Sequence, residues 1–134
     1  MRAVLCLAAE GVIRDAETNT ISVFNILERI TATGFPLFIQ RLTFFALWER
    51  ALEDPERTMG HFRAELGGRD LHTIDLPIDF QGRLLNRTTI RIAGLVVPQP
   101  GSLRFSIALE DGTTASYTVE VNAVVDAVQV DERT

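Results

Sequence analysis

The sequence predicts an all-β protein, a two-layer antiparallel Greek-key β-sandwich of broadly immunoglobulin-like type with about eight strands. Apolar and polar side chains alternate with a period of two in several segments, and turn-forming residues recur about every 8–15 residues. No long segment has the apolar spacing of a helix. The chain has 134 residues, of which 46% are hydrophobic, and this length suits one domain with a sizeable core. We therefore assign residues 1–134 to a single β-sandwich domain, with roughly 126–134 as a loose acidic tail.

The first two strands are predicted within the first 31 residues. Residues 2–10 are apolar on both faces, which indicates a strand that is covered on both sides. The window 20–31 is rich in β-branched residues, which favour a strand over the helix that its apolar count also allows. Its alternation changes phase at Val23-Phe24, as it does at a β-bulge, and Asn25 is expected to satisfy backbone groups there.

A strand near 41–50 carries bulky apolar side chains on both faces. One face consists of Leu42, Phe44, Ala46 and Trp48. Phe45 and Leu47 lie on the opposite face, and an apolar loop or edge segment, 35–39 with Phe38, precedes the strand. Because a strand in a two-layer sandwich has only one face on the core, the second face needs a cover. We expect a homodimer with Phe45, Leu47 and Phe38 at or near the shared surface, in which Phe45→Arg gives a folded monomer. The alternative is a loop, such as 35–39, that folds over this face.

A first hairpin is predicted from two alternating segments, 58–66 and 74–80. The turn between them is Gly67-Gly68-Arg69-Asp70, and a three-residue loop places Arg63 opposite Asp75. Pro77 cannot donate a ladder hydrogen bond, which favours the edge of a sheet for the second strand.

A second hairpin is predicted from residues 103–109 and 115–121, after a further strand at 88–95. A three-residue loop from Asp111 to Thr113 sets Leu109 opposite Ala115 and keeps both apolar sets on one face. It also sets Arg104 opposite Glu120, an opposite-charge pair on the wet face.

The charges disfavour nucleic acid as a partner. The chain has 13 basic residues, all of them Arg, and 18 acidic residues, which gives a net charge of -5. The arginines form no basic cluster in the sequence, and a nucleic-acid-binding face needs one. No apolar run approaches the roughly 20 residues of a transmembrane helix. Cys6 is the one cysteine, so no internal disulfide forms, and we expect a cytoplasmic protein.

The two histidines are the residues nearest to a catalytic or metal-binding group. His61 is expected on the wet face and His72 inward at a strand end, with Asp70, Asp75 and Asp79 nearby. A metal site needs ligands that converge on one face, and this spacing does not predict one. No serine-nucleophile or phosphate-loop motif occurs either. We assign no catalytic residue, no cofactor and no metal site.

Several short motifs run along the chain: residues 9–15, 22–28, Phe35-Pro36, Phe80-Gln81-Gly82, 100–105 and 115–117. Together they resemble a family of small, stand-alone bacterial proteins classed as a domain of unknown function. The resemblance covers nearly the whole chain. It implies a β-sandwich of broadly immunoglobulin-like type and no established activity, so it assigns no functional residue.

The function that the sequence favours is a non-enzymatic binding or structural module of bacterial origin that contacts proteins, including its own copies. One alternative is a small metal-dependent or acid–base hydrolase that uses His61, His72 and the nearby aspartates. Another is a carrier that holds a small ligand or lipid between the two sheets.

Overall fold

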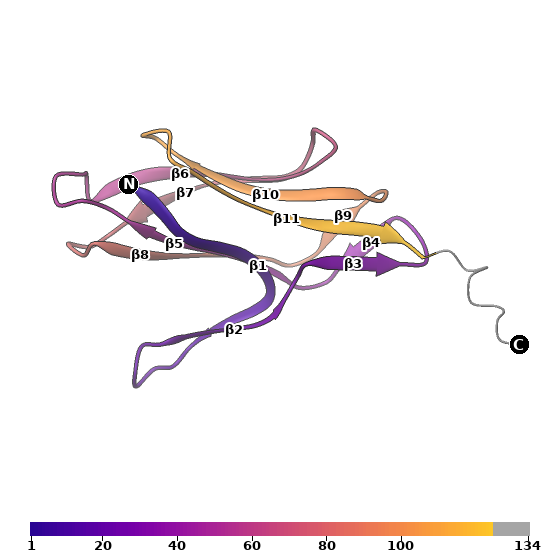
Figure 1. Cartoon of the computed structure of the whole chain (residues 1–134), viewed down its shortest axis with the longest axis horizontal. Coiled ribbons are helices and arrows are strands. Elements are labelled where there is room, and N and C mark those ends of the chain that lie inside the picture. Colours follow the sequence, from indigo (N-terminus) through magenta and orange to yellow (C-terminus); the bar gives the residue numbers. More distant parts are fainter. Residues whose placement is uncertain (125–134) are drawn as a thin grey trace, which may run out of the picture.

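Eleven strands and no helix make up residues 1–124, the part of the chain that the computed structural model describes (Figure 1). The strands are β1 (Arg2–Arg14), β2 (Ile21–Ile26), β3 (Arg29–Ala32), β4 (Leu37–Ile39), β5 (Leu42–Glu49), β6 (Arg57–Leu66), β7 (Arg69–Asp79), β8 (Leu85–Ile92), β9 (Leu95–Val97), β10 (Gly101–Leu109) and β11 (Thr114–Ala123). The all-β prediction is confirmed, but about eight strands was too low an estimate. The window 20–31 divides into β2 and β3, and the short β4 and β9 pair with each other. The predicted acidic tail, 126–134, lies outside the described residues.

Two sheets form the layers of the sandwich. The four-stranded sheet has the order β2-β1-β5-β8, and the five-stranded sheet has the order β3-β11-β10-β6-β7. All strand pairs in residues 1–124 are antiparallel except β3 with β11, which run parallel. The expectation of purely antiparallel pairing was therefore wrong at this one pair. After β2 the chain crosses from the first sheet to the edge of the second, and this crossing fixes the direction of β3.

The main core lies between the sheets and is built on aromatic side chains. The predicted inner face of β5, from Leu42 to Trp48, is buried as expected. Its Phe44 ring lies 5.2 Å from the ring of Phe62 on β6, and Phe62 lies 6.3 Å from Phe105 on β10. Aromatic pairs at such distances contribute about 0.5–1.5 kcal/mol each beyond their burial. Phe44 joins the two sheets, because Phe62 and Phe105 both belong to the five-stranded one.

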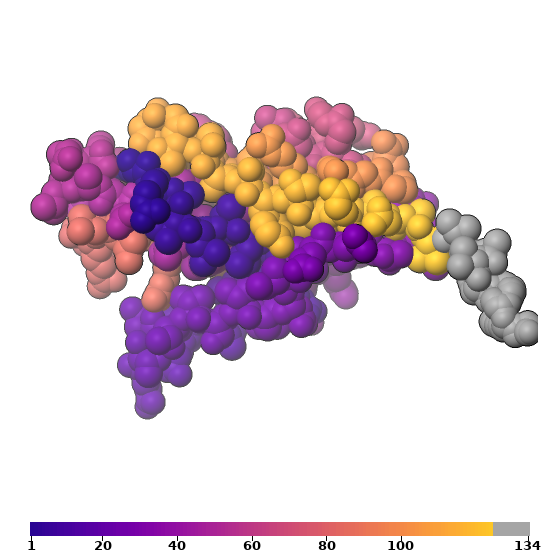
Figure 2. All heavy atoms as spheres, viewed as in Figure 1, coloured from indigo at the N-terminus to yellow at the C-terminus, as the bar shows by residue number. Residues whose placement is uncertain are grey.

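Strand β1 pairs with a different strand in each part of its length. Its first half, up to Ala9, pairs with β5, and from Ala9 onward it pairs with β2. Val4 and Leu5, in the predicted strand, are exposed, so the expected cover on both faces is confirmed only at Leu7, Ala8 and Ala9, which are buried. Beyond them β1 curves away from the sandwich, and its last residues form with β2 a hairpin that runs under β5 and β8 (Figure 1). We call residues 9–26 the arm; Figure 2 shows it as a separate ridge below the body of the molecule.

The pairing of β2 with β1 corrects the expected β-bulge. The register is unbroken through Val12↔Val23 and Gly11↔Phe24, so the chain has no bulge at Val23-Phe24. The irregular residue is Asn25, whose φ is 56° and whose side chain donates to Glu10. Asparagine tolerates this left-handed backbone better than most residues.

The β10–β11 hairpin keeps the predicted faces but not the predicted register. Leu109 N–H donates to Thr113 O at 2.8 Å, so the three loop residues are Glu110, Asp111 and Gly112. Gly112 has a φ of 92° at the third loop position, where a three-residue hairpin needs a left-handed residue. The register differs by two residues from the expectation: Ile107 faces Ala115, and Glu120 faces Ser102 rather than Arg104.

The β6–β7 hairpin is tighter than predicted. Gly67 and Gly68, with φ of 58° and 83°, form a two-residue loop of the kind that suits the twist of a hairpin. A register shift at Ala64/Glu65 then places Arg63 opposite Thr73, not Asp75. The position of β7 at a sheet edge, which Pro77 predicted, is confirmed.

Gly112→Ala should lower the free energy of unfolding by about 1–3 kcal/mol, the usual cost of a strained backbone conformation. A methyl group at this position meets no atom within 4 Å, so the cost comes from φ alone. Gly34→Ala is the matched control, because that site is equally open and its φ is not left-handed. Urea denaturation of both variants measures the difference. Equal stabilities would contradict the turn as described.

Candidate functional site

The arm covers the second apolar face of β5. Phe45 is only 3% exposed and packs in a small second core with Leu7, Ala9 and Val12. Leu47 is half-buried against the same cluster. The expectation that Phe45 lies on a surface open to a second copy was wrong, because the arm of the same chain occupies that space. Neither segment 35–39 nor a partner is needed as the cover.

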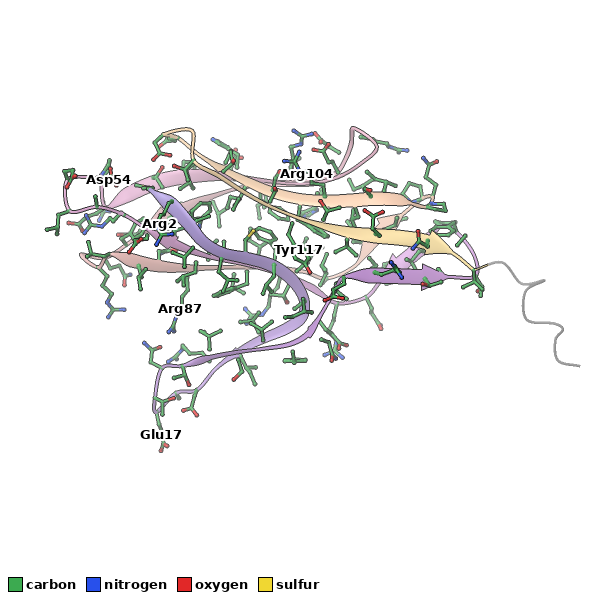
Figure 3. The ribbon with its side chains drawn as sticks, viewed as in Figure 1. Arg2, Glu17, Asp54, Arg87, Arg104 and Tyr117 are labelled. Atoms are coloured by element: carbon green, nitrogen blue, oxygen red, sulfur yellow. The ribbon has the colours of Figure 1, made fainter. Side chains whose placement is uncertain are left out.

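Polar contacts fasten the arm at both ends. At its tip, Asn19 Oδ1 accepts hydrogen bonds from Arg87 Nη1 on β8 at 3.2 Å and from Arg14 Nη1 at 3.4 Å. Figure 3 shows Arg87 reaching from β8 toward the arm. Just beyond β2, Tyr117 OH donates to Leu27 O at 2.6 Å, and burial raises the pKa of this tyrosine. These contacts hold the arm in one position on the sandwich.

The outer face of the arm carries a row of exposed apolar side chains. Ile13, Phe24 and Ile26 are 43–60% exposed, and we call them the arm stripe. The Phe24 ring lies directly over Gly11, where even a Cβ atom would come within 2.1 Å of it. Gly11 thus leaves room for the ring over the neighbouring strand. The sequence analysis missed this stripe; an aromatic residue that can pair with a glycine across a hairpin was the available signal.

Among the three predicted interface residues, Phe38 is the one that is exposed. It lies on β4 at 60% exposure, opposite Val96 on β9, which is also exposed. Its ring covers Gly94. This second apolar patch is smaller than the arm stripe and is formed by strands of three residues each.

The two histidines lie on opposite faces of the five-stranded sheet. His61 pairs across the strands with Asp75, and its Nδ1 lies 2.8 Å from Asp75 Oδ1 on the outer face. His72 is opposite the buried Ala64, on the other face, with its ring 6.5 Å from that of Phe62. Within residues 1–124, no group of three or more His, Cys, Asp or Glu side chains could hold a metal ion. The sheet itself separates the side chains that a hydrolytic site would have to bring together.

A cleft of about 540 Å³ opens between the arm tip and the segment that connects β7 with β8. Its lining includes Asn19, Leu47, Phe80, Arg83 and Arg87. The space between the sheets is filled by side chains that are almost completely buried. This hollow therefore lies on the outside of the sandwich.

A charge cluster joins the first residue to two turns. The Met1 amino group lies 3.2 Å from Asp54 Oδ2 and 3.5 Å from Asp111 Oδ2. The pKa of Asp54 is lowered by the hydrogen bond from Ala51 N–H and by this amine, and the pKa of Asp111 is lowered mainly by Thr113. The hydrogen bond to Asp54 raises the pKa of the amino group. This cluster is structural, since its groups satisfy one another.

Cys6 lies half-buried in β1, and its Sγ donates to Ser116 O at 3.2 Å. Burial raises the pKa of the thiol, so it is a weaker nucleophile than a free cysteine.

No helix in residues 1–124 is long and apolar enough to cross a membrane.

One family model matches the chain, that of the family of unknown function DUF6941, over residues 3–122. Searches of curated proteins and of solved structures find no match. The matched range contains the whole arm and nearly all of the sandwich.

Phe45→Ala should lower the free energy of unfolding by about 3–5 kcal/mol, as large-to-small changes in a core do. Phe45→Arg should unfold the arm or the whole chain rather than give a folded monomer, because it buries a charge without a partner. Phe38→Ala, at an exposed position, is the control and should change stability by less than about 1 kcal/mol. Chemical denaturation followed by circular dichroism measures all three. A Phe45→Arg protein as stable as the parent would restore the original expectation.

The cluster of the Met1 amino group with Asp54 and Asp111 should make the free energy of unfolding fall at both acid and alkaline pH. The two aspartates titrate below their ordinary value of 3.8, so their contribution is lost as pH falls below it. The amine titrates above 8.0, so its contribution is complete below that pH and is lost as pH rises beyond it. Thermal unfolding from acid to alkaline pH should show both losses, and Asp54→Asn should reduce them. An Asp54→Asn profile identical to that of the parent would exclude this cluster as the cause.

Proposed function

The chain belongs to the family of unknown function DUF6941, and we propose that it is a non-enzymatic binding module that acts through contacts with proteins. The arm stripe is the observation that carries this proposal. Ile13, Phe24 and Ile26 are exposed on the arm, which stands out from the sandwich (Figure 2). Exposed apolar patches with an aromatic centre are typical of protein interfaces.

The stripe is distinct from a few scattered surface residues. Ile13 lies diagonally across the hairpin from Phe24, and the left-handed Asn25 separates Phe24 from the exposed Ile26. Side chains in such positions touch when one of them is aromatic. The contacts of Val12 and Asn19 with the sandwich already fix the arm, so a partner meets an ordered surface.

The finer description of the fold is part of the proposal. We assign the sandwich to the Greek-key, immunoglobulin-like type, supported by β5 and β6 lying in different sheets and by the parallel pairing of β3 with β11. The half-buried, unpaired Cys6 supports a cytoplasmic location. The bacterial origin rests on the resemblance of the sequence motifs.

The two alternative functions have less support. A hydrolase would need His61 and His72 in one cleft, and they lie on opposite faces of a sheet. A carrier would need space between the sheets, where Phe44, Phe62 and Phe105 are packed together.

Photo-cross-linking in the cells that make the protein tests the proposal. A photoreactive phenylalanine analogue in place of Phe24 should give a protein adduct. The same analogue in place of Thr118, an exposed polar residue on β11, is the control and should give none. Absence of an adduct at Phe24, or equal yields at both positions, would contradict a binding role for the arm.

A further inference from the structure

We propose that the arm binds a second copy of this chain, with β2 of each copy pairing antiparallel about a two-fold axis at Phe24. This inference rests on the proposed function and names its partner. The argument starts from the edges of the sheets. A free strand edge presents unpaired backbone groups, and proteins protect such edges with charges, with proline or by keeping them short.

Among the four outermost strands of the two large sheets (β2, β8, β3 and β7), β2 alone lacks all three protections. The edge strand β8 carries Arg87 and Arg91, β7 carries Pro77 and several charges, and β3 carries Arg29. The strands β4 and β9 have only three residues each. Strand β2 has six residues, Ile21–Ile26, with no charge and no proline. Its edge is open to strand addition, in which backbone hydrogen bonds supply affinity.

Electrostatics favour this edge for self-association. The chain carries a net charge of -5, so two copies repel each other when most surfaces approach. Between two uncharged β2 strands, no like charges come directly opposite one another. A closed dimer with a two-fold axis also uses the edge completely and leaves no edge free for further growth.

The register follows from the alternation of side chains. Residues paired across antiparallel strands point to the same face. Centring the axis on Phe24 therefore places the two Phe24 rings together and sets Ser22 of each copy opposite Ile26 of the other. The two arms then form one continuous four-stranded ribbon, β1-β2-β2-β1, and each Phe24 ring loses part of its exposure to water. Stable interfaces bury about 800 Å² per partner, and so short a ladder lies at the low end of that scale, so we expect a dissociation constant in the micromolar range.

Sedimentation velocity over a concentration series tests the inference. The parent protein should approach twice the mass of the 14.9 kDa chain as its concentration rises. Ile26→Lys and Ser22→Glu should each shift the protein to one-chain mass, because a charged side chain on an edge strand disfavours pairing with another strand. Circular dichroism should show that both variants are folded, since both side chains are exposed. The double variant Ser22→Glu/Ile26→Lys should restore the dimer, because each introduced carboxylate then faces an introduced ammonium on the other copy.

Phe38→Glu is the matched control, because it adds a charge to the other exposed apolar patch, and it should leave the dimer intact. A one-chain mass for the parent at every concentration overturns the inference. The inference is also overturned if Phe38→Glu dissociates the dimer while Ile26→Lys leaves it intact. It is overturned as well if the double variant remains at one-chain mass. The proposed function fails separately: a Phe24 cross-link to a different protein supports a binding module while overturning self-pairing, and the absence of any adduct contradicts both.

Discussion

The double burial of β1 at Leu7, Ala8 and Ala9 is the constraint on which the rest of the molecule depends. At these residues β1 separates two cores, one between the sheets and one under the arm. Ala8 belongs to the first core and Leu7 and Ala9 to the second. Small side chains let the strand lie close to both layers at once. Because the same strand continues into the arm, its placement in the sandwich also decides where the arm lies.

The position of the arm explains both why Phe45 is buried and why the arm stripe is exposed. A two-stranded ribbon has two faces, and the arm buries one of them, with Val12 and Val23, against β5. Its other face is left with Ile13 and Phe24, and Ile26, beyond Asn25, is exposed as well. An isolated ribbon of two strands is marginally stable in water, so the buried face is what keeps the exposed face in shape.

Local patterns predicted the strands well, and non-local packing accounts for most of what they missed. The alternation along β5, β6, β10 and β11 identified the inner faces, because period two depends only on neighbouring residues. The hairpin registers were harder, since they depend on which loop residue takes the left-handed backbone: Gly112 in one hairpin, Gly67 and Gly68 in the other. The apolar outer face of β5 was recognised correctly as needing a cover. Its cover could not be identified, because the arm comes from residues 9–26 and reaches Phe45 only after β1 bends.

The parallel pairing of β3 with β11 joins two strands that are synthesised at different times. Strand β3 leaves the ribosome early, whereas β11, its only neighbour in the five-stranded sheet, is made last among the described strands. At ordinary rates of translation several seconds separate the two. During that interval the acceptor at Leu27 waits for the hydroxyl of Tyr117, and the second core lacks one of its contacts. The five-stranded sheet therefore cannot be completed until β11 has been made, and until then β3 lacks its strand partner.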